Sequence, residues 1–337
     1  MRMFSTFAAI VAGITTCCGA GAAEETHLVM TTIALPNTPT SQIYHDWADR
    51  INESGKGLIN IDVRDGMSIV NSTNFYDRLM ADVMQISFGS LNNLAGKFRL
   101  SQVMSLPFIF DSSEQASVVF WRLYKSGLLD SEFDEIVPLF FQGYPQVSLH
   151  LVKVPAAPLV DLKGFKIIAF GQASTAVFNQ LGASPLSIPL SETYQALQRG
   201  TADGLAFPMA PILDFKLHEV ARYHVLASLG GGPGGVWMAK AKYSSLSPEV
   251  RKILEENSGE HESREAGRDL DRQQANVPQK LAADPNQIVA TLTPDQVKAW
   301  AADLSGVSAA WAAANKPHGE AVLTKARELA ADFSVGK

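Results

Sequence analysis

Short apolar runs alternate with segments of helical spacing along much of the chain. Between residues 162 and 208 the apolar runs are Lys166–Phe170, Leu186–Leu190 and Gly204–Phe207, and the helical segments are Ala173–Leu181 and Ser191–Arg199. Strands that alternate with helices of this size predict βαβ crossovers and a parallel sheet. In such sheets small ligands bind beyond the carboxyl ends of the strands, where helix N-termini also lie.

The same alternation opens the chain. Strand-like runs occupy Leu28–Ala34, Leu58–Val63 and Gln85–Phe88, with helical spacing across Ser41–Glu53 and Thr73–Val83. In the first helical segment Ile43, Trp47 and Ile51 recur at the period of an amphipathic helix. This β-α-β-α-β order predicts the first half of a doubly wound α/β domain.

The rest of the chain reads as further strands and then mostly helix. Asp111 is the predicted cap of the first of these helices, and the full set of expected helices is Ser112–Ser126, Leu213–Ala221, Ser247–Lys280, Pro294–Leu304, Val307–Ala314 and Gly319–Phe333. The expected strands are Val137–Gln142, Val147–Val152, Tyr223–Ala227 and Val236–Ala239. The pattern therefore predicts an α/β fold that ends in long C-terminal helices.

Two crossings divide this pattern into lobes. The chain leaves a first lobe near Val147 and returns near Gly230, so we expect residues 24–147 and 230–337 in the first lobe with the C-terminal helices, and 148–229 in the second. Gly230–Gly235 lacks the Lys-Ser/Thr that follows a phosphate-binding loop, which favours a hinge. Two α/β lobes joined in this way are the architecture of a hinged binding protein.

Residues 1–23 have the pattern of a signal peptide. Arg2 gives the positive region, Phe7–Ile14 the apolar core and Ala20–Ala22 the cleavage pattern, so we expect cleavage after Ala22 or Ala23. The apolar core is too short to span a bilayer, although a retained amphipathic anchor is an alternative. Because Cys17 and Cys18 both lie in this segment, the exported chain would hold no thiol or thiolate metal site.

Charge and catalytic patterns exclude several function classes. The 28 basic and 34 acidic residues give a net charge of −6, without the basic stripe of a nucleic-acid surface. Gly171–Thr175 only approaches a nucleophile elbow, and we interpret Ser174 as a helix cap or anion contact. The histidines lack metal-site spacing, and Asp203 is interpreted as a local cap. We therefore expect no enzyme activity, catalytic residue, metal or cofactor.

Several segments carry a family resemblance. LKGFKI at 162–167, LGASP at 181–185 and ETYQALQRGTADG at 192–204 resemble the solute receptors of TRAP transporters, the DctP-like periplasmic binding proteins. Further similar segments are Leu106–Phe108 and Lys216–Tyr223, and the likeness extends from roughly Thr26 to Gly259. It implies a type II-like two-lobed periplasmic fold, each lobe a mixed sheet flanked by helices. It also implies delivery of a small organic solute to TRAP membrane subunits.

One position departs from the family pattern. In the family, the strand that begins Lys-Gly-x-Lys usually ends in an arginine, whose planar guanidinium binds a substrate carboxylate through two hydrogen bonds. The matching residue here is Ile168. A carboxylate buried against it would lose about 2–5 kcal/mol, the cost of an unpaired charge. We therefore expect this cleft to bind simple dicarboxylates poorly.

The other cleft positions implied by the resemblance are mostly amide, small or apolar. With Ile168, the predicted ligand-binding residues are Asn37, Asn71, Phe88, Gly89, Ser148, Phe207, Met209 and Trp237. Core packing is the alternative interpretation of the three aromatic residues, and a turn is the alternative for both asparagines.

An apolar cleft with a few amide and hydroxyl donors suits a neutral, aromatic or amphipathic solute. A small cation enclosed by aromatic rings stays open, as does a carboxylate held by helix N-terminal amides near Ser174. The leading interpretation is a TRAP receptor. An exported α/β hydrolase-like enzyme and an orphan or sensory receptor are the alternatives.

Overall fold

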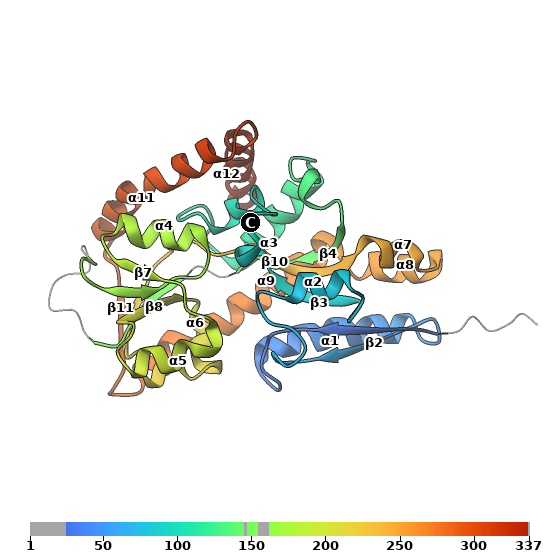
Figure 1. Ribbon diagram of the computed structural model, residues 1–337, viewed down its shortest axis with the longest axis horizontal. Helices are drawn as coiled ribbons and strands as arrows, with labels where there is room; N and C mark the ends of the chain where they lie inside the picture. Colours follow the sequence, from blue (N-terminus) through green and yellow to red (C-terminus); the bar gives the residue numbers. More distant parts are fainter. Residues whose placement is uncertain (1–24, 145–146, 154–161, 336–337) are drawn as a thin grey trace, which may run out of the picture.

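The computed structural model describes residues 25–144, 147–153 and 162–335 of the chain. The expected signal peptide, residues 1–23, and its cleavage positions Ala22 and Ala23 lie outside the described residues. Figure 1 shows two groups of strands side by side with helices around them.

The first sheet is five-stranded and mixed, in the order β2-β1-β3-β10-β4. Its strands are β1 (Thr26–Thr31), β2 (Ile59–Arg64), β3 (Ile86–Ser90), β4 (Ile136–Phe141) and β10 (Gly234–Ala239). β1 pairs parallel with β2 and β3, whereas β10 runs antiparallel between β3 and β4. The interior strand β10 therefore comes from a part of the chain distant from β3.

The second sheet is six-stranded, in the order β11-β9-β5-β8-β6-β7. Its strands are β5 (Ser148–Leu151), β6 (Lys166–Ile168), β7 (Ser184–Leu186), β8 (Gly204–Phe207), β9 (Tyr223–Leu226) and β11 (Ile288–Thr291). β5 is antiparallel to both of its neighbours, and the remaining pairs are parallel. Both sheets are mixed and flanked by helices, as predicted for each lobe.

The helices cover the sheets and link them. They are α1 (Pro39–Ser54), α2 (Phe75–Met80), α3 (Ser113–Lys125), α4 (Gln172–Gln180), α5 (Leu190–Gln198), α6 (Met209–Asp214), α7 (Lys240–Ser245), α8 (Pro248–Glu256), α9 (Gly259–Ala275), α10 (Val277–Ala282), α11 (Pro294–Ala314) and α12 (Gly319–Val335). Short 3₁₀ segments are η1 (Leu91–Leu94), η2 (Ser101–Ser105), η3 (Asp130–Glu132) and η4 (Leu217–Glu219). No described helix has both the length and the apolar character needed to cross a membrane.

The chain crosses between the sheets more often than the sequence predicts. It passes to the second sheet between β4 and β5 and returns between β9 and β10. It then crosses again, because β11 pairs in parallel with β9, with Ile288 opposite Tyr223. The expected assignment of residues 230–337 to the first lobe is therefore wrong for β11.

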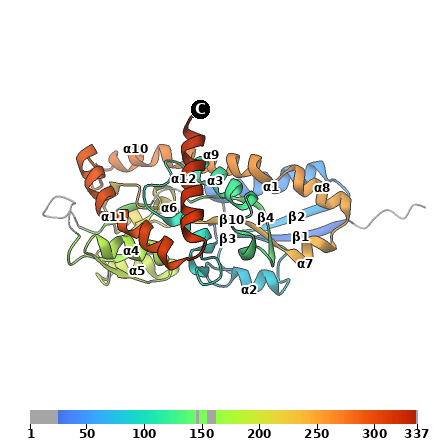
Figure 2. The ribbon, with the colours of Figure 1, turned by 90° about the horizontal axis from the view of Figure 1, so that it is seen from above.

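Three long helices, α9, α11 and α12, connect the halves. α9 contacts α1 and α3 beside the first sheet and α6 and α10 beside the second. α11 packs on α4, whereas α12 packs on α3, so the C-terminal pair runs from the side of the second sheet to the middle of the molecule (Figure 2). A capping box begins α11, in which the Thr293 hydroxyl accepts from the Gln296 backbone N–H and the Gln296 side chain accepts from the Thr293 N–H.

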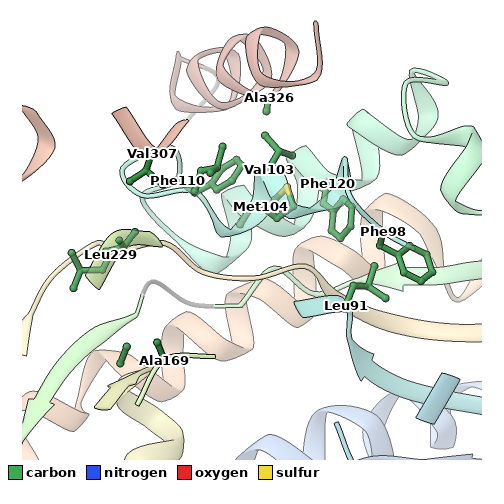
Figure 3. Packing of buried hydrophobic residues seen from close by; sticks show 14 of the residues in the cluster. Leu91, Phe98, Val103, Met104, Phe110, Phe120, Ala169, Leu229, Val307 and Ala326 are labelled. Atoms are coloured by element: carbon green, nitrogen blue, oxygen red, sulfur yellow. The ribbon is translucent and has the colours of Figure 1, made fainter. Parts of the chain in front are cut away.

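The largest core cluster is continuous across both halves. It contains Trp237 of β10 together with Leu149 and Val225 of the second sheet. Figure 3 shows its centre, where Val103, Met104, Phe110 and Phe120 point toward one another beneath α12. Apolar burial therefore joins the sheets through this cluster, in addition to the connecting segments.

Three local predictions are corrected by the backbone. The cap of α3 is Ser112, whose side chain accepts from the Gln115 N–H, and not Asp111. The expected strand Leu186–Leu190 is wrong, because β7 ends at Leu186 and α5 begins directly after Pro189. Proline has no N–H to donate to a strand ladder, which favours this break.

The expected helix Leu213–Ala221 is also wrong. α6 starts earlier, at Met209, and ends at Asp214. Lys216 has a φ of 54°, in the left-handed region, so the chain turns there and continues only as the short η4. The left-handed turn therefore lies two residues after the end of α6.

Candidate functional site

A cavity of about 160 Å³ is lined by residues from both sheets and their helices. Thr40 and Tyr44 of α1, with Phe88 of β3, come from the side of the first sheet. Ser174 of α4 and Phe207 of β8 come from the side of the second. A cavity of ~150 Å³ holds a benzene-sized ring. The cavity between the halves is therefore large enough for a small molecule.

Each wall contributes a cluster of aromatic rings. On the first wall, the Phe88 ring centroid lies 4.9 Å from that of Tyr44 and 6.0 Å from that of Tyr144. On the second wall, the Phe207 ring lies 5.6 Å from Phe170 and 6.2 Å from Phe215. These separations are within the range of favourable aromatic pairs. The cavity can therefore enclose a ring from both sides.

Few polar groups face this apolar space. The Tyr44 hydroxyl donates to Gln142 Oε1 at 2.7 Å, and both residues line the cavity. Gln142 Nε2 is buried and has no hydrogen-bond partner among the described residues. Burial raises the pKa of both Tyr44 and Tyr144, so the two phenols stay neutral. Gln142 therefore offers an unused amide donor.

Asp214 is the one residue among the described lining residues that carries a charge at neutral pH. The Thr40 hydroxyl donates to Asp214 Oδ2 at 3.3 Å, but it also lies 3.2 Å from Gln273 Oε1. A hydroxyl has a single proton and can satisfy only one of these acceptors at a time. Burial raises the pKa of Asp214, and the Thr40 hydrogen bond opposes this only in part. The negative charge of Asp214 is therefore only partly offset by its hydrogen bond from Thr40.

Two of the residues predicted from the sequence, Phe88 and Phe207, line this cavity. Asn37 is exposed with a φ of 62°, and Asn71 Oδ1 accepts from the backbone N–H groups of Thr73 and Asn74. Both asparagines therefore hold turns outside the described lining. Ser148 is largely buried and, with Phe108 and other residues, lines a separate depression.

The remaining predicted residues are packed in the core, outside the described cavity lining. A Cβ on Gly89 would lie 2.3 Å from the Phe75 ring. Trp237 is fully buried, and its Nε1–H donates to the Gly89 carbonyl at 3.0 Å. Ile168 and Met209 belong to the core cluster against which Phe207 packs. Direct ligand contact by any of these four stays a prediction.

The structure also gives the positions of Ser174 and Asp203, for which capping roles were expected. Ser174 lines the cavity in the first turn of α4, but the cap position is Gly171, so Ser174 is not the cap. Asp203 Oδ2 accepts from the Lys166 N–H at 2.9 Å and holds the start of β6. Among the described residues, no group of three or more acidic, histidine or cysteine side chains could hold a metal ion.

Sequence reasoning did not identify several lining residues, namely Tyr44, Gln142, Tyr144, Phe170, Asp214 and Phe215. The expected helix Leu213–Ala221 obscured the last two, because it assigned Asp214 and Phe215 to its first turn. A signal was present, because Asp214 is a lone acid within the apolar run Ile212–Phe215. Ionisable groups in apolar surroundings are candidates for functional sites.

A buried pair of histidines lies behind the second wall. His150 of β5 and His224 of β9 are opposite each other and fully buried, with their Nδ1 atoms 2.7 Å apart. His150 Nε2 lies 2.9 Å from the carbonyl of Phe207, and His224 Nε2 lies 2.9 Å from Gln287 Oε1. Burial, and then the neighbouring His224, lowers the pKa of His150 to about 3. Burial also lowers the pKa of His224.

This pair predicts acid-sensitive stability. Protonating both rings would set two N–H groups against each other across the 2.7 Å contact, so the folded pair binds at most one proton. The unfolded chain binds two protons well below pH 6.5. The free energy of unfolding should therefore fall as the pH drops below 6.5, between pH 7 and pH 5 by at least about 2 kcal/mol, and by about 4 kcal/mol when both folded rings stay neutral. Urea unfolding at the two pH values measures this loss.

The double variant His150→Gln/His224→Gln provides the control. Its unfolding free energy should change much less between pH 7 and pH 5, because no buried imidazole remains at these positions. An equal pH dependence in the variant and the parent would contradict the assignment.

Several known proteins are similar to this chain in sequence. The family model DctP, described as bacterial extracellular solute-binding protein, family 7, matches residues 30–314. The outer membrane transporter protein TsaT of Comamonas testosteroni is 25% identical over 248 residues, which cover 72% of each chain. The 2,3-diketo-L-gulonate-binding periplasmic protein YiaO of Escherichia coli is 26% identical over 212 residues, 61% of this chain and 63% of that protein.

A solved structure is similar across nearly the whole molecule. It is a TRAP solute binding protein from Rhodoferax ferrireducens in complex with copurified benzoate. The TM-score is 0.86 at 26% sequence identity, covering 92% of this chain and 99% of the other. The two mixed sheets and the long C-terminal helices therefore have a close counterpart among TRAP solute receptors.

Proposed function

The chain belongs to the DctP family of bacterial extracellular solute-binding proteins, and from this premise we propose that it captures a small ring-bearing solute between its two lobes. The observation that best supports this proposal is the pair of aromatic clusters, centred on Phe88 and Phe207, that line one cavity from opposite sides. A flat ring between them would bury its apolar faces against both walls.

The proposed mechanism is closure of the lobes over the solute. A solute that contacts both walls stabilises the closed arrangement by its differential affinity for that state. The loop that contains Gly230 and Gly231 lines the cavity and connects β9 to β10, which supports a hinge at this point. We propose that the closed receptor then delivers its solute to TRAP membrane subunits in the periplasm.

We further propose that the site lacks the family's carboxylate clamp. Ile168 occupies the position of the expected arginine and is fully buried in an apolar cluster. The lining residues within the described part of the chain include no lysine, arginine or histidine. A dicarboxylate would therefore enter the cavity with no positively charged side chain to replace its hydration.

This proposal predicts selective stabilisation by ring-bearing solutes. A solute present at 100 times its Kd stabilises the folded state by about 2.7 kcal/mol, and the Tm should rise by about 4 °C. In a thermal-shift panel of aromatic amines, alcohols and acids, at least one compound should raise the Tm by this amount. Succinate should shift the Tm by less than about 1 °C, and a succinate shift equal to the best aromatic one would contradict the proposal.

An uptake assay distinguishes the transport role from the sensory and enzymatic alternatives. Vesicles that carry the cognate TRAP membrane subunits should accumulate the identified solute only when the purified receptor is added. A sensory receptor would bind the solute without supporting uptake, and a hydrolase-like enzyme would convert it to product. Uptake that is unchanged when the receptor is omitted would refute the transport role.

A further inference from the structure

Asp214 sets the charge of the cavity. It is half-buried at the end of α6, next to Phe215, whose ring packs on Phe207. Its only hydrogen-bond donor within the described residues is Thr40, which is shared with Gln273. It forms no salt bridge with any described residue. A half-buried carboxylate in this state lacks a positive partner.

The other groups of the cavity do not supply that partner. The described lining residues contain no basic side chain, and the phenols of Tyr44 and Tyr144 remain neutral. The electron-rich faces of the surrounding rings also favour positive charge. Asp214 and the ring faces therefore both favour a cation in the cavity.

We propose that the solute is a small organic cation, an amine or quaternary ammonium carried on a ring. Its charge pairs with Asp214, and its ring lies between the clusters of Phe88 and Phe207. This inference rests on the proposed receptor function and adds the charge class of its solute. It sets this chain apart from the Rhodoferax ferrireducens protein, which was solved with benzoate.

A carboxylate solute is the competing possibility. The first turn of α4 reaches the cavity at Ser174, and free N–H groups at a helix start attract anions. That partial positive charge would have to offset both desolvation of the anion and repulsion from Asp214 in the same cavity of about 160 Å³. A cation is instead attracted both by the Asp214 carboxylate and by the faces of the aromatic rings. We therefore favour a cationic solute over a carboxylate.

The test compares probes that share one ring and differ in charge. Isothermal titration calorimetry at pH 7 is carried out with benzylamine, benzyltrimethylammonium, benzyl alcohol and benzoate on the unmodified protein. At least one of the two cations should bind at least tenfold more tightly than benzyl alcohol, and benzoate should bind least. Benzoate or benzyl alcohol binding as tightly as the better cation would overturn the inference and leave the receptor function intact.

Asp214→Asn tests the assigned carboxylate. This variant should lose at least tenfold in affinity for the cation and less than threefold for benzyl alcohol, whereas Asp214→Glu should retain the preference for cations. Asp49→Asn, at an exposed position of α1, removes the same charge elsewhere and should leave all affinities unchanged. An unchanged cation affinity in Asp214→Asn would overturn the assignment.

Failure of the receptor function would look different. If no probe binds, and a wide panel of neutral, cationic and anionic metabolites also gives no binding, both the receptor function and the charge class are refuted. If the Asp214 variants unfold, the probe series on the unmodified protein still decides the charge class.

Discussion

Replacing Trp237 with alanine should lower the free energy of unfolding by about 3–5 kcal/mol, the largest effect that we expect from a single substitution. The indole is fully buried on β10, an interior strand of the first sheet. Its ring centroid lies 5.5 Å from Phe141 and 6.0 Å from Phe133, and its Nε1–H donates to Gly89. Alanine would leave a cavity and remove this hydrogen bond. Urea unfolding without solute measures the resulting loss in the free energy of unfolding.

Trp237→Phe separates packing from the hydrogen bond. It keeps an aromatic ring and should lose only about 1–3 kcal/mol, because one buried acceptor loses its donor. A loss below 1 kcal/mol for the alanine variant would contradict the assigned core role. Affinity measured on Trp237→Phe also tests the sequence-based expectation of ligand contact, since a core role predicts nearly unchanged binding.

Phe207→Ala should weaken binding of the ring-bearing solute by about 10- to 100-fold, which corresponds to roughly 1.4–2.7 kcal/mol. Phe207 lines the cavity and packs against both Phe170 and Phe215, so its removal opens the second wall. The measurement is calorimetric titration with the tightest probe of the aromatic series.

Phe207→Leu restores most of the volume without the aromatic face. It should bind more weakly than the parent but more tightly than the alanine variant. Since Phe207 is only partly buried, both variants should remain folded, which their thermal unfolding curves would show. Equal affinity in the parent and the alanine variant would exclude Phe207 from the site.

The sequence was informative where periodicity and composition were unambiguous. The mixed α/β order, the long C-terminal helices and the family follow from apolar runs and quoted segments, and Phe88 and Phe207 were already candidates. β11 was missed because Ile288–Thr291 is a short edge strand with partly exposed residues, so its pattern of burial does not alternate clearly.

The charge of the cavity could not be read from spacing alone. Asp214 and Thr40 are 174 positions apart in the sequence and meet only because the two halves pack together. Likewise, the Phe88 and Phe207 clusters lie on different sheets, and no local pattern indicates that they face one cavity. The turn at Lys216 also depends on the fold, since lysine rarely adopts a left-handed conformation.

The position of β10 has a consequence for how the protein is made. Ribosomes release the chain from its N-terminus, yet the strand that joins β3 to β4 comes only from residues 234–239. Until that strand emerges, β3 and β4 each expose an unpaired edge, and the first sheet stays in two pieces. The first sheet can therefore be completed only after β5 to β9, all but one strand of the second sheet, have been synthesised.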